Sequence, residues 1–92
     1  MNEPYRIAAR RGEQLGILVV PGCEITRKKP VGHINALFVE DVNAISSEDP
    51  QESMDEARRQ NAVVMLNHPG WPDDHFEVSD IQRRWLDEGR FN

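Results

Sequence analysis

Three short apolar segments along this chain predict the strands of a small sheet. Residues 17 to 20 read ILVV without an alternating polar position, which is typical of a strand covered on both faces, as in a parallel sheet. With the residues that follow, this strand is expected over 17–24. The runs INALFV at 34–39 and AVVMLN at 62–67 predict two further strands of the same sheet.

Amphipathic segments between these runs predict helices. The first helix is expected over 4–15, because Pro4 suits a first helical turn and Gly16 suits a helix end. One face of this helix is expected to carry four residues: Ile7, Ala8, Arg11 and Leu15.

Capping sequences mark two more helices. The segment DPQE at 49–52 has the form of a capping box with proline at the first helical position, and it predicts a helix over 50–60. The segment SDIQ at 79–82 predicts a last helix over 79–88. Three residues of this last helix are expected to face the interior: Ile81, Trp85 and Leu86.

The segment from Glu40 to Asp49 is expected to be a loop, so the predicted order of elements is α-β-β-α-β-α. Its β-α-β portion favours an α/β fold, with residues 1–92 forming one small domain. The last helix ends at Gly89, close to the end of the sequence, and no strand precedes the first helix. We therefore expect an incomplete piece of a larger fold.

Composition and charge exclude several classes of protein. The 92 residues carry a net charge of −5, which argues against a nucleic-acid binder, because such proteins present a basic surface. No apolar run approaches the ~20 residues that span a bilayer, and no signal peptide is visible. The single cysteine, Cys23, cannot form an internal disulfide and is most simply a small buried residue. The expectation is a soluble cytoplasmic protein.

Three potential metal ligands lie at the ends of the predicted strands. Glu24 follows the first strand, His68 follows the third, and His33 precedes the second. Functional side chains gather at the carboxyl ends of parallel strands. His33 therefore joins the other two only if its strand is antiparallel to the first, or if the intervening turn folds it back. One carboxylate with two imidazoles suits Zn²⁺, Mn²⁺ or Fe.

Each of these residues also has a simpler interpretation. His33 and His68 are compatible with hydrogen bonds to their own loops, and Glu24 with an ordinary solvated carboxylate. The basic run RKK at 27–29 is compatible with solvated surface or, beside a metal, with attraction of phosphate. His75 is expected to be exposed in a polar loop. The spacing alone does not decide between these alternatives.

Taken together, the segments resemble the middle of a PHP domain, the polymerase and histidinol phosphatase family of metal-dependent phosphoesterases. The resemblance rests on PGCEIT at 21–26, GHINALF at 32–38 and NHPGW at 67–71, in the family's order. In the family, a glutamate follows a strand, a histidine precedes an apolar strand, and a later strand ends in His-Pro. The resemblance covers residues 13–92 and includes the predicted helix between the second and third motifs.

The resemblance implies a distorted (β/α)7 barrel with two or three divalent metal ions at the carboxyl ends of its strands. It implies that Glu24, His33 and His68 are metal ligands. It also implies hydrolysis of a phosphate-ester substrate by metal-activated water, with Arg27 and Lys28 assisting at the substrate phosphate.

The sequence also departs from the family pattern. The family begins with a strand carrying His-x-His, whereas the first 32 residues here contain no histidine. A late Asp-x-His motif is also missing, because the sequence DDH at 73–75 follows the His-Pro motif too closely. We therefore expect a fragment of a PHP phosphoesterase with little or no activity alone. The alternative is a non-catalytic remnant that forms a homo-oligomer through its open strand edges and binds at most one metal ion weakly.

Overall fold

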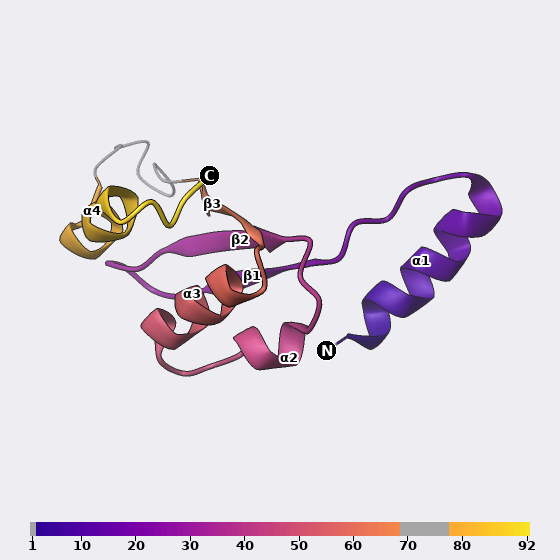
Figure 1. Cartoon of the computed structure of the whole chain (residues 1–92), viewed down its shortest axis with the longest axis horizontal. Coiled ribbons are helices and arrows are strands. Elements are labelled where there is room, and N and C mark those ends of the chain that lie inside the picture. The colour runs from indigo at the N-terminus through magenta and orange to yellow at the C-terminus, as the bar shows by residue number, and fades with distance from the viewer. Residues whose placement is uncertain (1, 69–77) are drawn as a thin grey trace.

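The computed structural model describes residues 2–68 and 78–92, which form a mixed α/β fold on one three-stranded sheet (Figure 1). The strands, in the spatial order β1-β2-β3, are β1 (Gly22–Thr26), β2 (His33–Leu37) and β3 (Val63–Asn67). The helices are α1 (Glu3–Leu15), α2 (Val42–Ile45), α3 (Pro50–Arg59) and α4 (Asp80–Asp87). The α/β class predicted from the sequence is confirmed.

Both strand pairs are antiparallel, so the expectation of a parallel sheet is wrong. Successive side chains of a strand point to opposite faces of a sheet. The inner face is apolar and buried, and it carries Ile25, Ile34, Ala36 and Val64. The outer face is largely polar near one end of the strands, where Glu24, Thr26, His33 and Asn67 lie. One packed face and one polar face is an ordinary arrangement for an antiparallel sheet.

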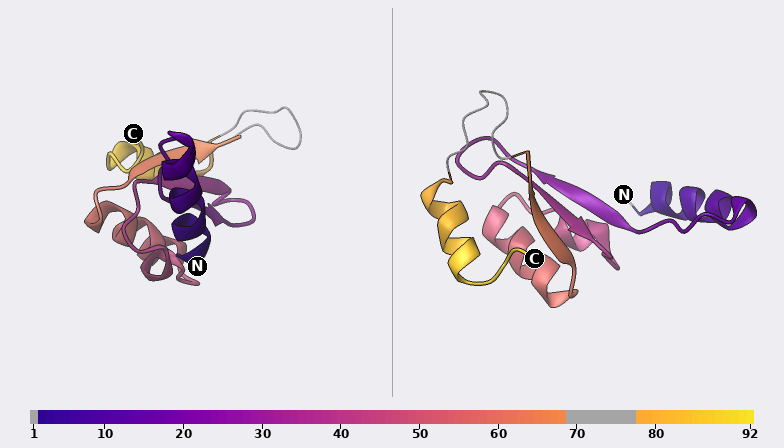
Figure 2. Two further views of the ribbon diagram at one scale, coloured as in Figure 1. Left: turned by 90° about the vertical axis from the view of Figure 1, so that its right-hand side faces the viewer. Right: turned by 90° about the horizontal axis from the view of Figure 1, so that it is seen from above.

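The first strand begins later than predicted. The run ILVV at 17–20 lies outside β1, in the segment that joins α1 to the sheet (Figure 2). Ile17 is 59% exposed and Leu18 is 87% exposed. Within the described residues, no strand pairs with this run, which leaves Ile17 and Leu18 exposed. Pairing starts at Gly22, which lies opposite Leu37 of β2.

Helix α2 occupies the segment that was predicted to be a loop. Asp41 caps it by accepting a hydrogen bond from the backbone N–H of Asn43, and Val42 and Ile45 are buried. The helix has only 4 residues, which is too short for an apolar periodicity to show in the sequence.

The predicted caps of α3 and α4 differ in their outcome. Asp49 caps α3 as predicted, but Glu52 accepts a hydrogen bond from the Ser47 hydroxyl at 2.6 Å and does not complete a capping box. The predicted capping box of α4, formed by Ser79 and Gln82, is present.

Helix α4 turns Trp85 into the core, as predicted. Its indole N–H donates a hydrogen bond to the side-chain oxygen of Gln51 at 2.8 Å, which connects α4 to α3. Ile81 packs against the core, whereas Leu86 is 48% exposed, so its predicted inward position is wrong. With 100° between successive helical residues, Trp85 and Leu86 cannot both point to the core centre.

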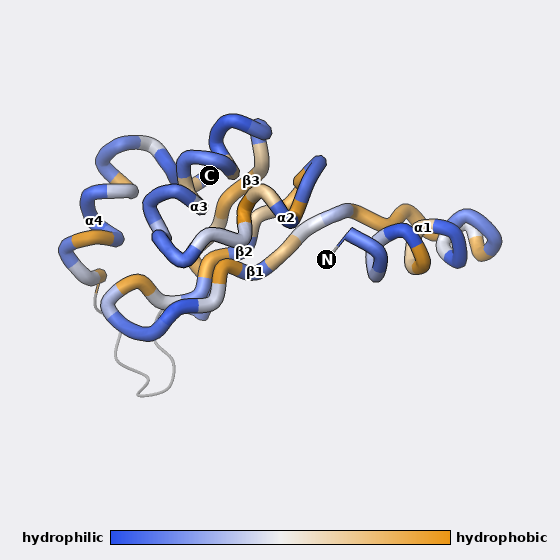
Figure 3. Tube along the Cα trace, turned by 90° about the horizontal axis from the view of Figure 1, so that it is seen from below, coloured by the Kyte–Doolittle hydropathy of each residue, from blue (hydrophilic) through white to orange (hydrophobic). Residues whose placement is uncertain are grey.

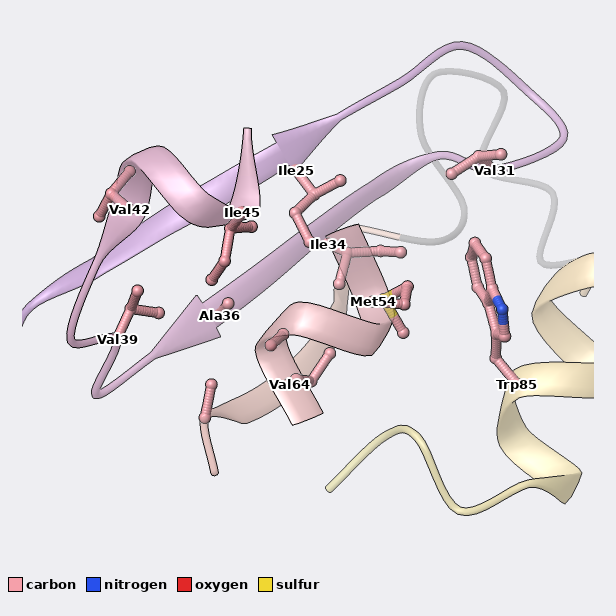
Figure 4. Packing of buried hydrophobic residues seen from close by; sticks show 12 residues of the cluster. Ile25, Val31, Ile34, Ala36, Val39, Val42, Ile45, Met54, Val64 and Trp85 are labelled. Carbon is pink, nitrogen blue, oxygen red and sulfur yellow. The ribbon is translucent and has the colours of Figure 1, made fainter. Parts of the chain in front are cut away.

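The core lies between the inner face of the sheet and α2, α3 and α4 (Figure 4). Its largest fully buried side chains are Trp85, Ile34 and Met54. All three helices therefore cover one face of the sheet and leave the face with Glu24 and His33 outside the core. Among residues 2–68 and 78–92, none of the helices has the length and hydropathy of a membrane-spanning segment.

Helix α1 projects from this body at the end opposite α4 (Figure 1). Gly12 is its one buried residue, and Ile7 and Leu15 are exposed, so the predicted stripe has no core to face. Figure 3, which is coloured by hydropathy, shows apolar residues on α1 and on the segment that follows it. Asn2 ties the start of α1 to the body by hydrogen bonds with Asp41 and with the N–H of Val42.

Candidate metal centre

The three sequence-predicted ligands lie together on the polar face of the sheet. Glu24 belongs to β1, His33 is the first residue of β2, and His68 directly follows β3. Because β2 is antiparallel to both neighbours, its first residue lies at the same edge as the last residues of β1 and β3. One ligand atom from each of the three residues lies within 4.8 Å of the others.

The three donors lie close enough together to share a single ion. His33 Nδ1 lies 3.4 Å from a carboxylate oxygen of Glu24 and 3.1 Å from His68 Nε2. Ligand bonds of about 2.0–2.2 Å arranged tetrahedrally place neighbouring donor atoms about 3.3–3.6 Å apart. The 3.4 Å separation falls in this range, and the 3.1 Å separation is slightly shorter. The donor set, one carboxylate oxygen with two imidazole nitrogens, suits zinc or a related divalent ion in its chemistry.

Two neighbours hold the Glu24 carboxylate. The Thr26 hydroxyl donates a hydrogen bond to one oxygen at 2.6 Å, and the Asn67 amide donates to the other at 3.1 Å. The Thr26 bond, above all, lowers the pKa of Glu24, with smaller contributions from Asn67 and from the nearby His33 and His68. Partial burial opposes this shift. The carboxylate is therefore kept in the anionic form that a metal requires.

His68 has an unusual backbone conformation. Its φ is 29°, in the left-handed region that non-glycine residues rarely adopt. Such strain persists where surrounding structure fixes it, and it concentrates at functional sites. The imidazole of His68 lies against that of His33, with the ring centroids 4.7 Å apart and the ring planes at 77° to each other.

A cavity of about 530 Å³ opens beside Glu24, within the size range of small-molecule sites. It is lined by residues 23–26 of β1, by Arg27 directly after that strand, and by residues 45–48 at the end of α2 and beyond it. Arg27 is half-buried, and its guanidinium donates to the carbonyl oxygens of Thr26 and Ser47. Lys28 is exposed in the turn that follows β1. Of the two residues expected to contact the substrate phosphate, Arg27 therefore lines the cavity and Lys28 is not among the residues that line it.

The remaining candidates lie elsewhere. Cys23 packs against the core, and burial raises the pKa of its thiol, which agrees with its interpretation as a small buried residue. His75 and the neighbouring Asp73 and Asp74 lie outside the described residues.

Sequence reasoning missed Thr26 and Asn67. Both lie beside proposed ligands in the sequence, Thr26 two residues after Glu24 and Asn67 directly before His68. Residues two apart on a strand share a face, so Thr26 was a possible partner of Glu24. The position of Asn67 depends on the register of three strands, which the sequence does not reveal.

No protein-family model matches this chain, and no curated protein matches it in sequence. A solved structure is similar over 99% of this chain, with 33% sequence identity and a TM-score of 0.93. It is the crystal structure of a two-domain protein from Bacteroides vulgatus ATCC 8482 that contains a predicted PHP-like metal-dependent phosphoesterase. The present chain spans 27% of the length of that protein.

Proposed function

We propose that this chain is a segment of a PHP-like metal-dependent phosphoesterase in which Glu24, His33 and His68 bind a divalent metal ion. The observation that carries the proposal is the convergence of these three donors from three strands. The similarity to a protein containing a predicted PHP-like phosphoesterase supports it independently. The sheet would then form part of the distorted barrel of that family, with the polar face toward the catalytic centre.

The substrate class that follows is a phosphate ester. A bound zinc, manganese or iron ion supplies a Lewis acid for phosphate oxygens and lowers the pKa of a water ligand. Glu24, His33 and His68 hold this ion on rigid strand ends, which fixes the directions of the ligands. Arg27 in the adjacent cavity and Lys28 beyond it are the residues that we propose to contact the substrate phosphate.

The metal site is tested by the effect of zinc or manganese on thermal unfolding. An ion that binds only the folded state raises the melting temperature by mass action. We expect this rise in the wild-type chain, its loss in His68→Ala, and its retention in His75→Ala. A rise of equal size in His68→Ala would contradict the proposed site.

Hydrolysis of a generic phosphoester is the corresponding activity test. Since three protein ligands suffice for one ion and the family's chemistry uses two or three, turnover by this chain alone is expected to be weak or absent. Robust turnover that survives His68→Ala would contradict the metal assignment. Robust turnover that depends on His68 would show that this chain alone is more active than we expect.

A non-catalytic, self-associating role is a second candidate. The observation that favours it is the exposure of apolar side chains on α1 and the following segment, where Ile7, Leu15, Ile17 and Leu18 are all more than half exposed. Clustered apolar surface of this kind is characteristic of interfaces. A monomeric mass at high concentration would argue against this role.

A further inference from the structure

Glu24 lies on the outer face of the sheet, where a carboxylate would ordinarily sample several rotamers. Its side chain is 37% exposed, yet each of its two oxygens accepts a hydrogen bond from a different residue. The Thr26 hydroxyl lies 2.6 Å from one oxygen and the Asn67 amide 3.1 Å from the other. These two bonds fix both the position and the rotation of the carboxylate plane.

The two donors reach Glu24 from opposite edges of the sheet. The register aligns Thr26 of β1 with His33 of β2, and His33 with Asn67 of β3, so the three residues form one row across the strands. Glu24 lies on the same face, two residues before Thr26. Asn67 thus ties the strand end that carries His68 to the carboxylate on β1. In this row His33 lies between Thr26 and Asn67.

Each carboxylate oxygen has two lone pairs and therefore keeps one free for a metal when a neighbour occupies the other. The oxygen that accepts from Thr26 is also the one 3.4 Å from His33 Nδ1, so it faces the other ligand atoms. The bond from the Thr26 hydroxyl therefore leaves one lone pair of this oxygen available for an ion. Outer partners of metal ligands orient them, and their loss weakens metal binding about 10–100-fold.

We infer that Thr26 and Asn67 are positioning residues, which orient the Glu24 carboxylate toward the ion shared with His33 and His68. The inference rests on the proposed metal centre and adds two residues that contact the ligand and not the ion. Neither side chain belongs to the core, so their effect on metal affinity is separable from any effect on folding.

The test compares zinc affinity in variants that remove only the hydrogen-bond donors. Thr26→Val keeps the shape and strand preference of threonine, and Asn67→Leu keeps the approximate size of asparagine. Thr26→Ser retains the hydroxyl and serves as the conservative rescue. Asn43→Leu, on the exposed surface of α2, is the matched control for the asparagine change. Zinc titration calorimetry gives the affinity, and melting of the metal-free chain reports folding.

We expect Thr26→Val and Asn67→Leu each to weaken zinc binding about 10–100-fold while the metal-free chains stay folded. Thr26→Ser and Asn43→Leu should bind as the wild type does. Equal zinc affinity in Thr26→Val, Asn67→Leu and the wild type would overturn the positioning role, while the loss of binding in His68→Ala would leave the metal centre standing. Absence of His68-dependent zinc binding in the wild type would overturn both. If Thr26→Val does not fold, Asn67→Leu alone decides.

Discussion

Glu24 contacts three other residues of the candidate site. Its carboxylate faces His33 and is held by Thr26 and Asn67 from two strands. The ligands themselves were predictable, because the sequence has only three histidines and two of them, His33 and His68, lie at the ends of predicted strands, as Glu24 does. Their convergence was not, since it depends on β2 running antiparallel to β1, one of two alternatives that the sequence left open.

A second carboxylate, Glu56 of α3, provides a prediction about pH. Hydrogen bonds from Arg59 and Gln60 lower the pKa of Glu56 to about 2, below the value of about 4.3 expected in an unfolded chain. A depressed pKa contributes stability that is present above the unfolded value and is lost as the pH falls toward the folded one. The wild type should therefore be more stable than Glu56→Gln near neutral pH, and this difference should shrink between pH about 4.3 and 2.

Melting temperatures measured from pH 6 to pH 2 check this prediction. If the melting temperatures of the wild type and Glu56→Gln differ by the same amount at every pH, the ionised Glu56 carboxylate does not contribute to stability.

Among the elements, the helices with capping signals were predictable, and the segments without a packing partner were not. The caps at Asp49 and Ser79 depend on local hydrogen bonds that a short sequence motif specifies. The run ILVV has the composition of a buried strand, but strand formation also needs a neighbouring strand. In the described residues that neighbour is missing, so an apolar pattern alone placed the first strand too early.

The capping box of α4 gives a prediction about the stability of a single helix end. The Ser79 hydroxyl accepts from the N–H of Gln82 and donates to the carbonyl oxygen of Pro30 at 2.7 Å. Ser79→Ala should therefore destabilise the chain by about 1 kcal/mol. Urea unfolding measures this change, with Ser46→Ala at the end of α2 as a serine control that is not an N-cap. Equal effects of the two substitutions would argue against the cap.

The packing of α3 against the sheet gives a second prediction about the elements. Met54 is 1% exposed and lies in the core beside Ile34 (Figure 4). Replacing a buried methionine with alanine removes apolar contacts and leaves a cavity, which costs about 2–5 kcal/mol. Met54→Ala should lower the urea midpoint strongly, whereas Met65→Ala, on the partly exposed outer face of β3, should lower it less. The reverse order would show that the core is not where the structure places it.

At the scale of the whole molecule, the chain combines a small packed body with a projecting α1. The extents of 44 × 28 × 21 Å reflect this elongated shape. The similarity to the Bacteroides vulgatus structure covers 99% of the chain at a TM-score of 0.93, so the placement of α1 is part of the shared arrangement. The apolar side chains that are more than half exposed on α1 and the following segment are Ile7, Leu15, Ile17 and Leu18.

For the molecule as a whole, we predict self-association. We expect a dimer or larger oligomer at high micromolar concentration, because burial of Leu18 and its neighbours removes apolar surface from water. Leu18→Ser should reduce the oligomer fraction, and Leu86→Ser, at the opposite end of the molecule, should not. Light scattering gives the mass. A monomeric wild type at that concentration would contradict the prediction.

The central claim is that Glu24, His33 and His68 share one metal ion, and a zinc-soaked crystal tests it most directly. The anomalous signal of zinc locates the ion independently of the protein atoms. We predict one strong peak about 2.0–2.2 Å from a Glu24 oxygen, His33 Nδ1 and His68 Nε2. A fully soaked crystal with no peak among these three residues, or with zinc bound only elsewhere, would contradict the claim.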